Sequence, residues 1–379
     1  MLRFQLQQAS HQHVVFGVGD FGLVENVVEM LVAVKLFAKL PDFACGIFHR
    51  PLIYNLARNS GRIDISAKKN TVLIYNPNAG KFRRGGSALI ERAIQILKNQ
   101  GHDVTVAPTT GPQTAGGLAR EHLARGAELI VAAGGDGTIN EVAEGMAHSQ
   151  TPLAALPGGT ANVLAVETSL GLNLERAAER LSELRPRRIS LGHVTCDGGR
   201  VSRHFLLMAG IGLDAHIVYR VNAGLKARAG KLAYWLAGWS LLGKRLAEFD
   251  VEIDGEKRRC SFALVSKVRN YGGDFTIARN VTMLDDRFEV VLFEGCSSLR
   301  YVKYLIGLAL NRVAGMNGVT VLNATRVVAS APGDSRVYVQ IDGEYAGHLP
   351  AEIQIVPDAL TLMLSDEYAG QAATPAPPN

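Results

Sequence analysis

The sequence lacks several motifs that commonly define catalytic or metal-binding sites. It has no Walker A motif, because Gly80-Lys81 is followed by Phe82 instead of Ser or Thr. It has neither a His-Glu-x-x-His nor a Cys-x-x-Cys pattern, and its four cysteines lie far apart in the chain. These absences argue against a P-loop nucleotidase, a zinc protease and a disulfide framework, and they favour reduced, cytosolic thiols.

Long apolar runs and a strong charge excess are also missing. No uncharged apolar run reaches roughly 18 residues, so we predict no transmembrane helix. The nearest segment, Leu23–Leu40, has its polar residues on one half of a helical wheel, which fits either a packed amphipathic helix or an interfacial membrane helix. The net charge of +5 suits ATP or an anionic membrane surface, and no nucleic-acid-binding motif is present. We therefore expect a cytoplasmic protein, peripherally associated with the membrane, with no nucleic-acid partner.

The dinucleotide-binding pattern G-x-G-x-x-G/A occurs twice, at Gly17–Gly22 and Gly210–Ala215. The second match is followed by no acidic residue near the roughly 20-residue spacing of a ribose-binding acid. The first is followed by Asp42 at about that spacing, but it leaves room for only one βαβ unit. A dinucleotide site there is the less favoured alternative.

A more informative glycine-rich turn follows the apolar run Leu129–Ala133. It reads Gly134-Gly135-Asp136-Gly137-Thr138-Ile139-Asn140-Glu141. Glycines let the backbone approach a ligand closely, and a helix start offers unpaired N–H groups to phosphate. Thr138 and Glu141 also fit a capping box, which predicts a helix start at Thr138 and would suit any βα unit. The three glycines around one carboxylate favour a phosphate site.

Two further turns follow predicted strands, at Asn76–Gly80 and Pro157–Asn162. From Thr71 to about residue 190 the pattern alternates strand and helix, which predicts a doubly wound α/β domain with helices on both faces of a parallel sheet. In such a sheet the turns at the carboxyl ends of the strands line one ligand crevice. After residue 190, short strand-like runs follow one another and predict a mostly antiparallel second domain.

Two acidic clusters lie in the second half of the chain. Leu284-Asp285-Asp286 precedes a strand-like run and fits either a site for a hard cation such as Mg²⁺ or a polar turn. Asp342-Gly343-Glu344 ends another apolar run. If the strand continues, Asp342 and Glu344 face the same way and present a general base with a partner. The alternative is an Asp-Gly hairpin turn.

Together these pieces resemble the diacylglycerol kinase catalytic-domain family, which includes bacterial soluble lipid kinases and sphingosine kinases. The matching segments, which fall within Thr71 to Leu364, are Asn76–Gly80, Gly134–Val142, Pro157–Asn162, Gly210–Ala215, Leu284–Phe288 and Asp342–Glu344. The resemblance implies an ATP-dependent lipid kinase with an α/β nucleotide-binding domain over 69–190, a β-sandwich-like lipid-binding domain over 191–350, and a C-terminal strand, within 351–366, that returns to the first domain. Residues 1–68 form an extension of unknown role, and 367–379 are expected to be a disordered tail.

The resemblance also implies roles for individual residues. Glu344 would be the general base with Asp342 beside it, and Asp136 would hold the Mg²⁺ of the bound ATP. A structural Mg²⁺ would use Asp285 and the backbone of Thr282 and Arg287. The predicted nucleotide contacts are Asn76, Thr109, Gly134, Gly135, Asp136, Gly137, Thr138, Asn140, Glu141, Gly159 and Thr160.

Several alternatives stay open from the sequence. The insert Arg220–Arg245 surrounds aromatic residues with basic ones, which fits either an anionic bilayer surface or a core helix with a solvated end. An NAD kinase-like enzyme also uses a Gly-Gly-Asp-Gly-Thr loop, and a non-catalytic lipid- or nucleotide-binding protein is a third reading. The resemblance implies a lipid alcohol as the substrate, but the sequence does not specify which one, and a homodimer is one oligomeric state that it allows.

Overall fold

The structure is a computed structural model that describes residues 68–85, 87–213, 215–216, 245–271, 275–310, 312–333 and 335–372. Contacts divide the chain into two units, Met1–Ala57 and Arg58–Asn379, and the described residues all belong to the second. The predicted helix Leu23–Leu40, the glycine pattern at Gly17–Gly22 and most of the insert Arg220–Arg245 lie outside the described residues.

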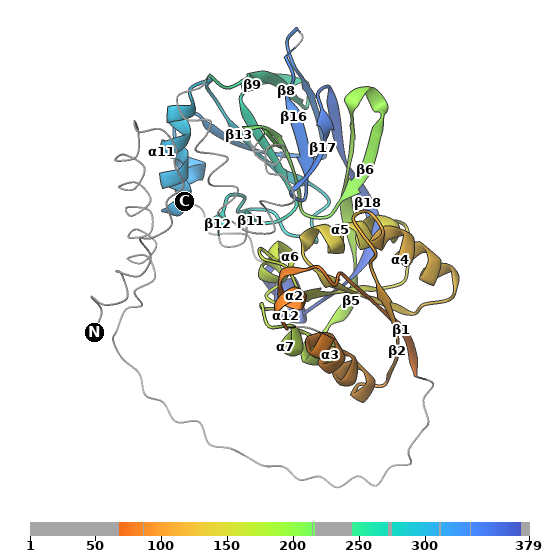
Figure 1. Cartoon of the computed structure of the whole chain (residues 1–379). Helices are drawn as coiled ribbons and strands as arrows, with labels where there is room; N and C mark the ends of the chain where they lie inside the picture. Colours follow the sequence, from red (N-terminus) through yellow and green to blue (C-terminus); the bar gives the residue numbers. More distant parts are fainter. Residues whose placement is uncertain are drawn as a thin grey trace, which may run out of the picture. The chain divides into compact units, whose positions relative to one another are not determined.

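The first part of the described chain builds a parallel sheet between two layers of helices (Figure 1). Its strands lie in the order β2-β1-β3-β4 and are all parallel. Their bounds are β1 Lys69–Tyr75, β2 His102–Pro108, β3 Leu129–Gly134 and β4 Leu153–Pro157. The helices are α2 Gly80–Gly85, α3 Ser87–Asn99, α4 Ala115–Ala124, α5 Asp136–Gly145, α6 Val163–Glu167, α7 Leu174–Glu179 and the 3₁₀ turn η1 Arg180–Glu183.

Alternation along the buried strands assigns side chains to the two faces of this sheet. Leu73 of β1 belongs to the core cluster that holds Leu97 of α3. Its neighbour Val72 belongs to a different cluster, with Ala119 of α4 and Val142 of α5. Successive strand residues point to opposite faces, so helices cover both sides, as the sequence predicts for a doubly wound domain.

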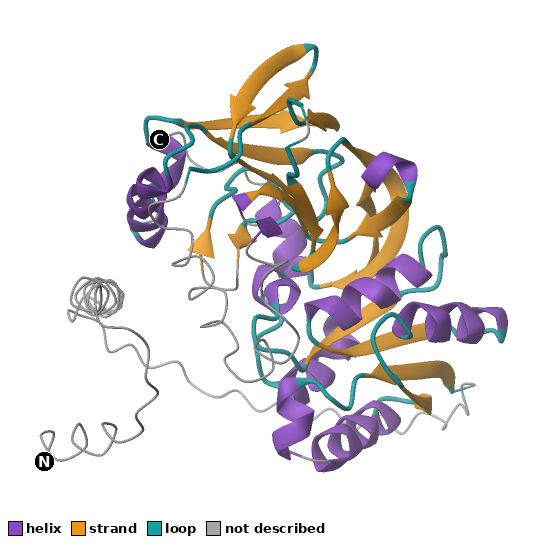
Figure 2. Ribbon diagram, turned by 45° about the horizontal axis from the view of Figure 1, so that its top comes forward, coloured by secondary structure: helices purple, strands orange, loops and turns teal. Residues whose placement is uncertain are grey.

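The second part of the chain is mostly β-structure (Figure 2). Its strands are β5 Arg185–Cys196, β6 Val201–Phe205, β7 Met208–Gly212, β8 Phe249–Ile253, β9 Glu256–Cys260, β10 Phe262–Ser266, β11 Asn270–Tyr271, β12 Phe275–Thr276, β13 Phe288–Phe293, β14 Val319–Ala324, β15 Arg326–Ser330, β16 Tyr338–Ile341, β17 Glu344–His348 and β18 Ala351–Leu364. Helical segments are η2 Asp197–Gly199, α11 Ser298–Ala309, η3 Val313–Gly315 and α12 Asp366–Ala372.

A β-sandwich forms where two sheets face each other in this part. One sheet has the antiparallel order β14-β13-β10-β7-β16-β17. Its inward residues, such as Ile211 and Val265, share one core cluster with Val327 of β15 and Ile353 of β18, which belong to the other sheet. The fold class predicted from the sequence is thus confirmed.

The C-terminal strand β18 connects the two parts, as the resemblance implies. Ile353 pairs antiparallel with Val327 of β15, whereas Leu362 pairs in parallel with Leu153 of β4. The larger sheet therefore runs continuously from the α/β part into the sandwich. The predicted domain boundary at residue 190 falls inside β5, which pairs along β18.

Several predicted elements differ from the structure. The expected disordered tail over 367–379 is wrong for 367–372, because these residues belong to α12, where Tyr368 is completely buried. Two runs that each read as one strand in the sequence are divided in the structure: His204–Met208 between β6 and β7, and Cys260–Lys267 between β9 and β10. Among the described residues, no helix is both long and apolar enough to cross a membrane.

Candidate active site

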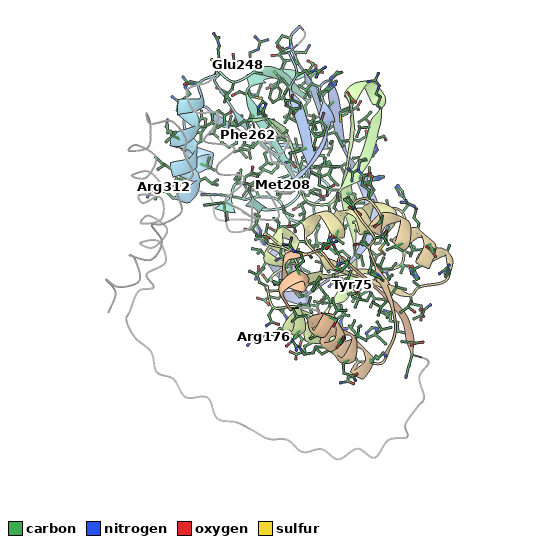
Figure 3. The ribbon with its side chains drawn as sticks, viewed as in Figure 1. Tyr75, Arg176, Met208, Glu248, Phe262 and Arg312 are labelled. Carbon is green, nitrogen blue, oxygen red and sulfur yellow. The ribbon has the colours of Figure 1, made fainter. Side chains whose placement is uncertain are left out.

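The predicted nucleotide turns meet at one edge of the parallel sheet. Because β1 to β4 are parallel, their carboxyl ends lie at the same edge, where ligands bind in open α/β sheets. Backbone hydrogen bonds join the turns there. The N–H of Thr109 donates to the carbonyl of Tyr75 (2.9 Å), and the N–H of Gly158 donates to the carbonyl of Gly134 (2.7 Å). Figure 3 labels Tyr75, the last residue of β1.

Glycine is required where the turn after β3 packs against the turn after β4. A Cβ atom on Gly159 would lie 2.5 Å from the Cα of Gly135, and one on Gly134 would lie 2.7 Å from the Cβ of Thr138. Real side chains do not come so close, so both positions need glycine. The two turns therefore pack backbone against backbone beside the N-terminus of α5, where the first helical N–H groups have no partner within the helix.

The capping box predicted at Thr138 and Glu141 is wrong. Helix α5 begins at Asp136 with Gly135 as its N-cap, so Thr138 lies within the first turn. The carboxylate of Glu141 instead accepts hydrogen bonds from the N–H groups of Gln113 (2.9 Å) and Ala115 (3.0 Å), at the start of α4. Glu141 thus joins two neighbouring helices, and its predicted nucleotide contact stays a prediction.

The carboxylate of Asp136, in the turn after β3, interacts with backbone N–H groups that follow the turn after β4. Its Oδ1 lies 3.4 Å from the N–H of Leu164, in the first turn of α6. Burial raises the pKa of Asp136, and the N–H groups of Val163, Leu164 and Asn162 counter part of that increase. A carboxylate in this position is held by backbone donors and has little contact with water, so it favours a cationic ligand.

Other predicted nucleotide residues lie around these turns. The Nδ2 of Asn76 donates to the Oγ1 of Thr138 (3.3 Å). The N–H of Lys81 donates to the carbonyl of Gly158 (3.2 Å), so these two turns are in contact, and a Cβ atom on Gly80 would lie 3.8 Å from the Oγ1 of Thr160. Asn140 is 1% exposed, and neither of its amide atoms has a hydrogen-bond partner among the described residues.

The Asp342-Gly343 segment is a hairpin turn, so the prediction that Asp342 and Glu344 share one strand face is wrong. Asp342 and Gly343 have positive φ, 48° and 81° respectively. Ile341 pairs with Glu344 across the turn. Two central residues with positive φ are typical of a two-residue hairpin. The extended geometry needed to point Asp342 and Glu344 the same way is therefore absent.

The carboxylate of Asp342 points into the turn between β6 and β7. It accepts hydrogen bonds from the N–H groups of Leu206 (2.8 Å), Leu207 (2.9 Å) and Met208 (2.8 Å). Burial raises the pKa of Asp342 to about 7, although these three donors act in the opposite direction. Asp342 thus fixes the hairpin that carries Glu344, and Figure 3 labels Met208 at this junction.

Glu344 lies directly against the glycine-rich turn that contains Gly137. A Cβ atom on Gly137 would be 2.7 Å from the Oε1 of Glu344, so the carboxylate occupies the space that a side chain at 137 would need. Glu344 begins β17 of the sandwich, whereas Gly137 lies in the first turn of α5. The structure thus brings the predicted general base to the glycine-rich turn.

Arg203 is a functional candidate that sequence reasoning missed. It lies in β6, and its Nη2 is 3.0 Å from the Oε2 of Glu144 in α5 and 3.9 Å from the Oε2 of Glu344. Burial lowers the pKa of Arg203, but hydrogen bonding to Glu144 and the charges of Glu144 and Glu344 leave it raised overall. No motif surrounds Arg203, so its role appears only when β6, α5 and β17 are brought together.

Helix α6 also has a buried charge at its other end. Glu167 is 1% exposed and accepts hydrogen bonds from Arg269, Asn270 and the hydroxyl of Tyr368 (3.0 Å). The Tyr368 hydroxyl in turn accepts from the N–H of Met283 (3.0 Å). This network connects α6 to the sandwich and to α12. The same helix contacts Asp136 of α5 at its other end, through the N–H of Leu164.

The loop that was predicted to bind a structural Mg²⁺ has two basic side chains, Arg287 and Lys267, beside Asp285. Both the N–H and the Oγ1 of Thr282 donate to Oδ2 of Asp285, each over 2.8 Å. The Nε of Arg287 lies 3.6 Å from Oδ1 of Asp285, and the ammonium group of Lys267 donates to the carbonyl of Asp285. Within the described ranges, no cluster of three His, Cys, Asp or Glu side chains could hold a metal ion.

Comparison with known families agrees with this geometry. Residues 70–194 match the diacylglycerol kinase catalytic domain, and residues 208–364 match the YegS C-terminal NAD kinase beta sandwich-like domain. A diacylglycerol kinase of Bacillus subtilis is 28% identical over 80% of this chain and 99% of its own length. A diacylglycerol kinase of Mycobacterium tuberculosis is 27% identical over 72% of this chain and 88% of its own length.

Solved structures show the same fold. A crystal structure of a diacylglycerol kinase from Bacillus anthracis aligns with a TM-score of 0.64 at 21% identity, covering 79% of this chain and 98% of the other. The two matched domains occur in the order that the fold shows, and between them they include both the glycine-rich turn and Glu344. This chain therefore belongs to the diacylglycerol kinase catalytic-domain family of lipid kinases.

Proposed function

We propose that the protein transfers the γ-phosphoryl group of ATP to the hydroxyl group of diacylglycerol or a similar lipid alcohol. One observation carries the proposal: the carboxylate of Glu344 in the sandwich lies against Gly137 in the glycine-rich turn. A phosphate bound at the turn would thus lie next to a group able to accept a proton. That adjacency is what phosphoryl transfer to an alcohol requires.

Each residue then has a separate task. The backbone N–H groups at the start of α5 bind phosphate oxygens, and the side chains of Asn76, Thr109 and Thr160 lie around the same strand ends. Glu344 accepts the proton of the lipid hydroxyl as that oxygen bonds to phosphorus. Arg203 holds Glu344 in place, whereas Asp342 fixes the hairpin that carries Glu344. Phosphoryl transfer depends mainly on such positioning and on charge stabilisation.

The residues around the turn fit a Mg²⁺ ion at Asp136. Carboxylate oxygen is a preferred ligand of Mg²⁺, and the desolvation that raises the pKa of Asp136 would be offset by a bound cation. When bound there, Mg²⁺ would neutralise charge on the phosphates. The loop at Asp285 does not fit in the same way, because Arg287 and Lys267 already provide positive charge next to it. We therefore assign it no metal.

The test is a panel of lipids incubated with γ-labelled ATP and Mg²⁺, with the products separated by thin-layer chromatography. Diacylglycerol, sphingosine, ceramide and NAD are the acceptors, so the panel also tests the NAD kinase alternative. We expect label in a lipid product, and loss of that product in Asp136→Asn but not in Asp254→Asn, a carboxylate in the β8–β9 turn. Label in NAD alone, or in no acceptor, would contradict the proposal.

A further inference from the structure

Helix α11 has an open apolar groove on the surface of the sandwich part. The groove has a volume of about 520 Å³ and is lined by Val302, Ile306, Leu310 and Met316 together with the basic residues Lys303 and Arg312. None of these residues belongs to the nucleotide turns or to β17, and Figure 1 shows α11 apart from α5. Figure 3 labels Arg312, just beyond the end of α11.

The two faces of α11 have different surroundings. Tyr301, Tyr304 and Leu308 point inward, and both tyrosine rings pack against Phe293 of β13. Val302, Ile306 and Leu310 recur every four residues and form the outer apolar stripe. Leu310 is 49% exposed, so this stripe is open at the end of the helix. Among the described residues, α11 thus has one face that packs on the core and a second apolar face that lines the open groove.

All charges of this segment have one sign. From Gly295 to Gly333 the sequence contains no Asp or Glu, whereas Arg300, Lys303 and Arg312 are exposed on or next to α11. An apolar helix face whose groove is lined by a lysine and an arginine, and by no acidic residue, is typical of a helix that lies in the interface of an anionic bilayer. A protein partner would have to match both an apolar face and an acidic rim, but an anionic phospholipid bilayer supplies both by its structure.

We propose that the α11 groove is a docking surface for an anionic phospholipid bilayer. The outer apolar stripe enters the acyl region, and Lys303 and Arg312 contact lipid phosphates. This inference rests on the proposed function, because a kinase of diacylglycerol must take its substrate from a membrane. It assigns the membrane contact to described residues that lie outside the predicted helix Leu23–Leu40 and the insert Arg220–Arg245.

Sedimentation of the full chain with vesicles tests the surface without any need for catalysis. The vesicles contain phosphatidylcholine alone or an equal mixture with phosphatidylglycerol. Leu310→Gln tests the apolar stripe against its matched control Leu172→Gln, because Leu172 is 50% exposed in the α/β part. Lys303→Glu tests the charge against Lys98→Glu, an exposed lysine of α3.

We expect binding to the mixed vesicles only, and a partition coefficient roughly 10- to 30-fold lower in Lys303→Glu, since two units of surface charge are changed. Leu310→Gln should lose roughly threefold to tenfold, because less apolar surface is inserted. Both controls should bind as the wild type. Binding of Leu310→Gln and Lys303→Glu at the wild-type level would overturn the proposal.

Two further measurements separate other outcomes. Light scattering of the wild type and Leu310→Gln without vesicles shows whether a second copy of the chain covers the groove, and a dimer lost only in the variant would overturn bilayer docking. Phosphorylation of a short-chain, soluble diacylglycerol by the wild type tests the proposed function alone. Failure there with intact vesicle binding would refute the kinase proposal, whereas normal turnover with unaffected vesicle binding in the variants would refute only the docking surface.

Discussion

The Nη2 of Arg203 lies 3.9 Å from the Oε2 of Glu344 and 3.0 Å from the Oε2 of Glu144. Arg203 thus connects α5, which starts at the glycine-rich turn, to the hairpin that carries the proposed base. The side chain of Arg203 is 20% exposed, so solvent screens its contacts with the two carboxylates only in part. We expect this contact to help orient Glu344 toward Gly137.

We predict that Arg203→Met lowers kcat roughly 10- to 100-fold, the usual effect of misplacing a reacting group by about an ångström. KM for ATP should change little, because the nucleotide turns do not include Arg203. Arg203→Lys should recover part of the activity, since it restores the charge but not the planar geometry. Arg326→Met removes an exposed ion pair with Glu352 and serves as the control. Equal kcat in Arg203→Met and the control would show that the contact is incidental.

The glycine at 137 gives a second test. In Gly137→Ala the new methyl group would meet Oε1 of Glu344 at 2.7 Å, so the flexible carboxylate must move away while the backbone stays in place. We expect a loss of at least about tenfold in turnover with little change in the melting temperature. Gly117→Ala is the matched control in α4, where an added methyl group meets no atom within 4 Å. Normal turnover in Gly137→Ala would mean that Glu344 is not needed at this position.

The strand ends and the glycine turns could be predicted from the sequence because both depend on local rules. Leu129–Ala133 is a short buried run before glycines, and the structure has β3 ending at Gly134 as a result. The hairpin at Asp342 could not be decided locally, because Asp-Gly after an apolar run fits a strand end and a two-residue turn equally well. The contacts of Asp342 with Leu206, Leu207 and Met208 decide it.

The residues that sequence reasoning missed act through contacts distant in sequence. Arg203 has no local motif, and its partners Glu144 and Glu344 lie far away on either side of it in the chain. Tyr368 was assigned to a disordered tail because the Ala/Pro-rich residues follow it closely. Its burial depends on Glu167 and Met283, which no local pattern connects to it. In both cases tertiary contacts outweigh local composition.

Asp342 should make stability depend on pH. Burial raises its pKa from 3.8 to about 7 in the folded protein, so the folded state binds the proton more tightly than the unfolded state. The stability from this group is therefore fully present below pH 4 or so and is lost as the pH rises through about 7. Across that window the loss is at most ~1.4 kcal/mol per pH unit.

The measurement is urea unfolding of the wild type and Asp342→Asn at several pH values between about 4.5 and 7. Asp342→Asn is less stable overall, because its amide group meets an N–H donor in the β6–β7 turn. The difference in unfolding free energy between the two proteins should shrink as the pH rises. Parallel curves would show that Asp342 does not change its protonation in this range.

Tyr368 should contribute to the stability of the fold through its hydroxyl. Tyr368→Phe removes the hydrogen bond to Oε1 of Glu167 and leaves the N–H of Met283 without its partner. Because the site is buried, we expect a loss of about 1–3 kcal/mol in unfolding free energy. Tyr345→Phe, at a tyrosine that is 42% exposed, should stay within about 0.5 kcal/mol. A Tyr368→Phe variant as stable as this control would show that the network is not structural.

The most direct test of the account is the turnover of Glu344→Gln with soluble short-chain diacylglycerol, measured alongside ATP binding and thermal melting. The amide keeps the size of the carboxylate but cannot accept a proton. We predict a kcat lower by roughly 10²–10⁴-fold, the usual contribution of general base catalysis, with ATP affinity and melting temperature close to wild type. Glu256→Gln, at an exposed glutamate of β9, should keep full activity. A Glu344→Gln enzyme with near wild-type turnover would contradict the central claim that Glu344 is the base.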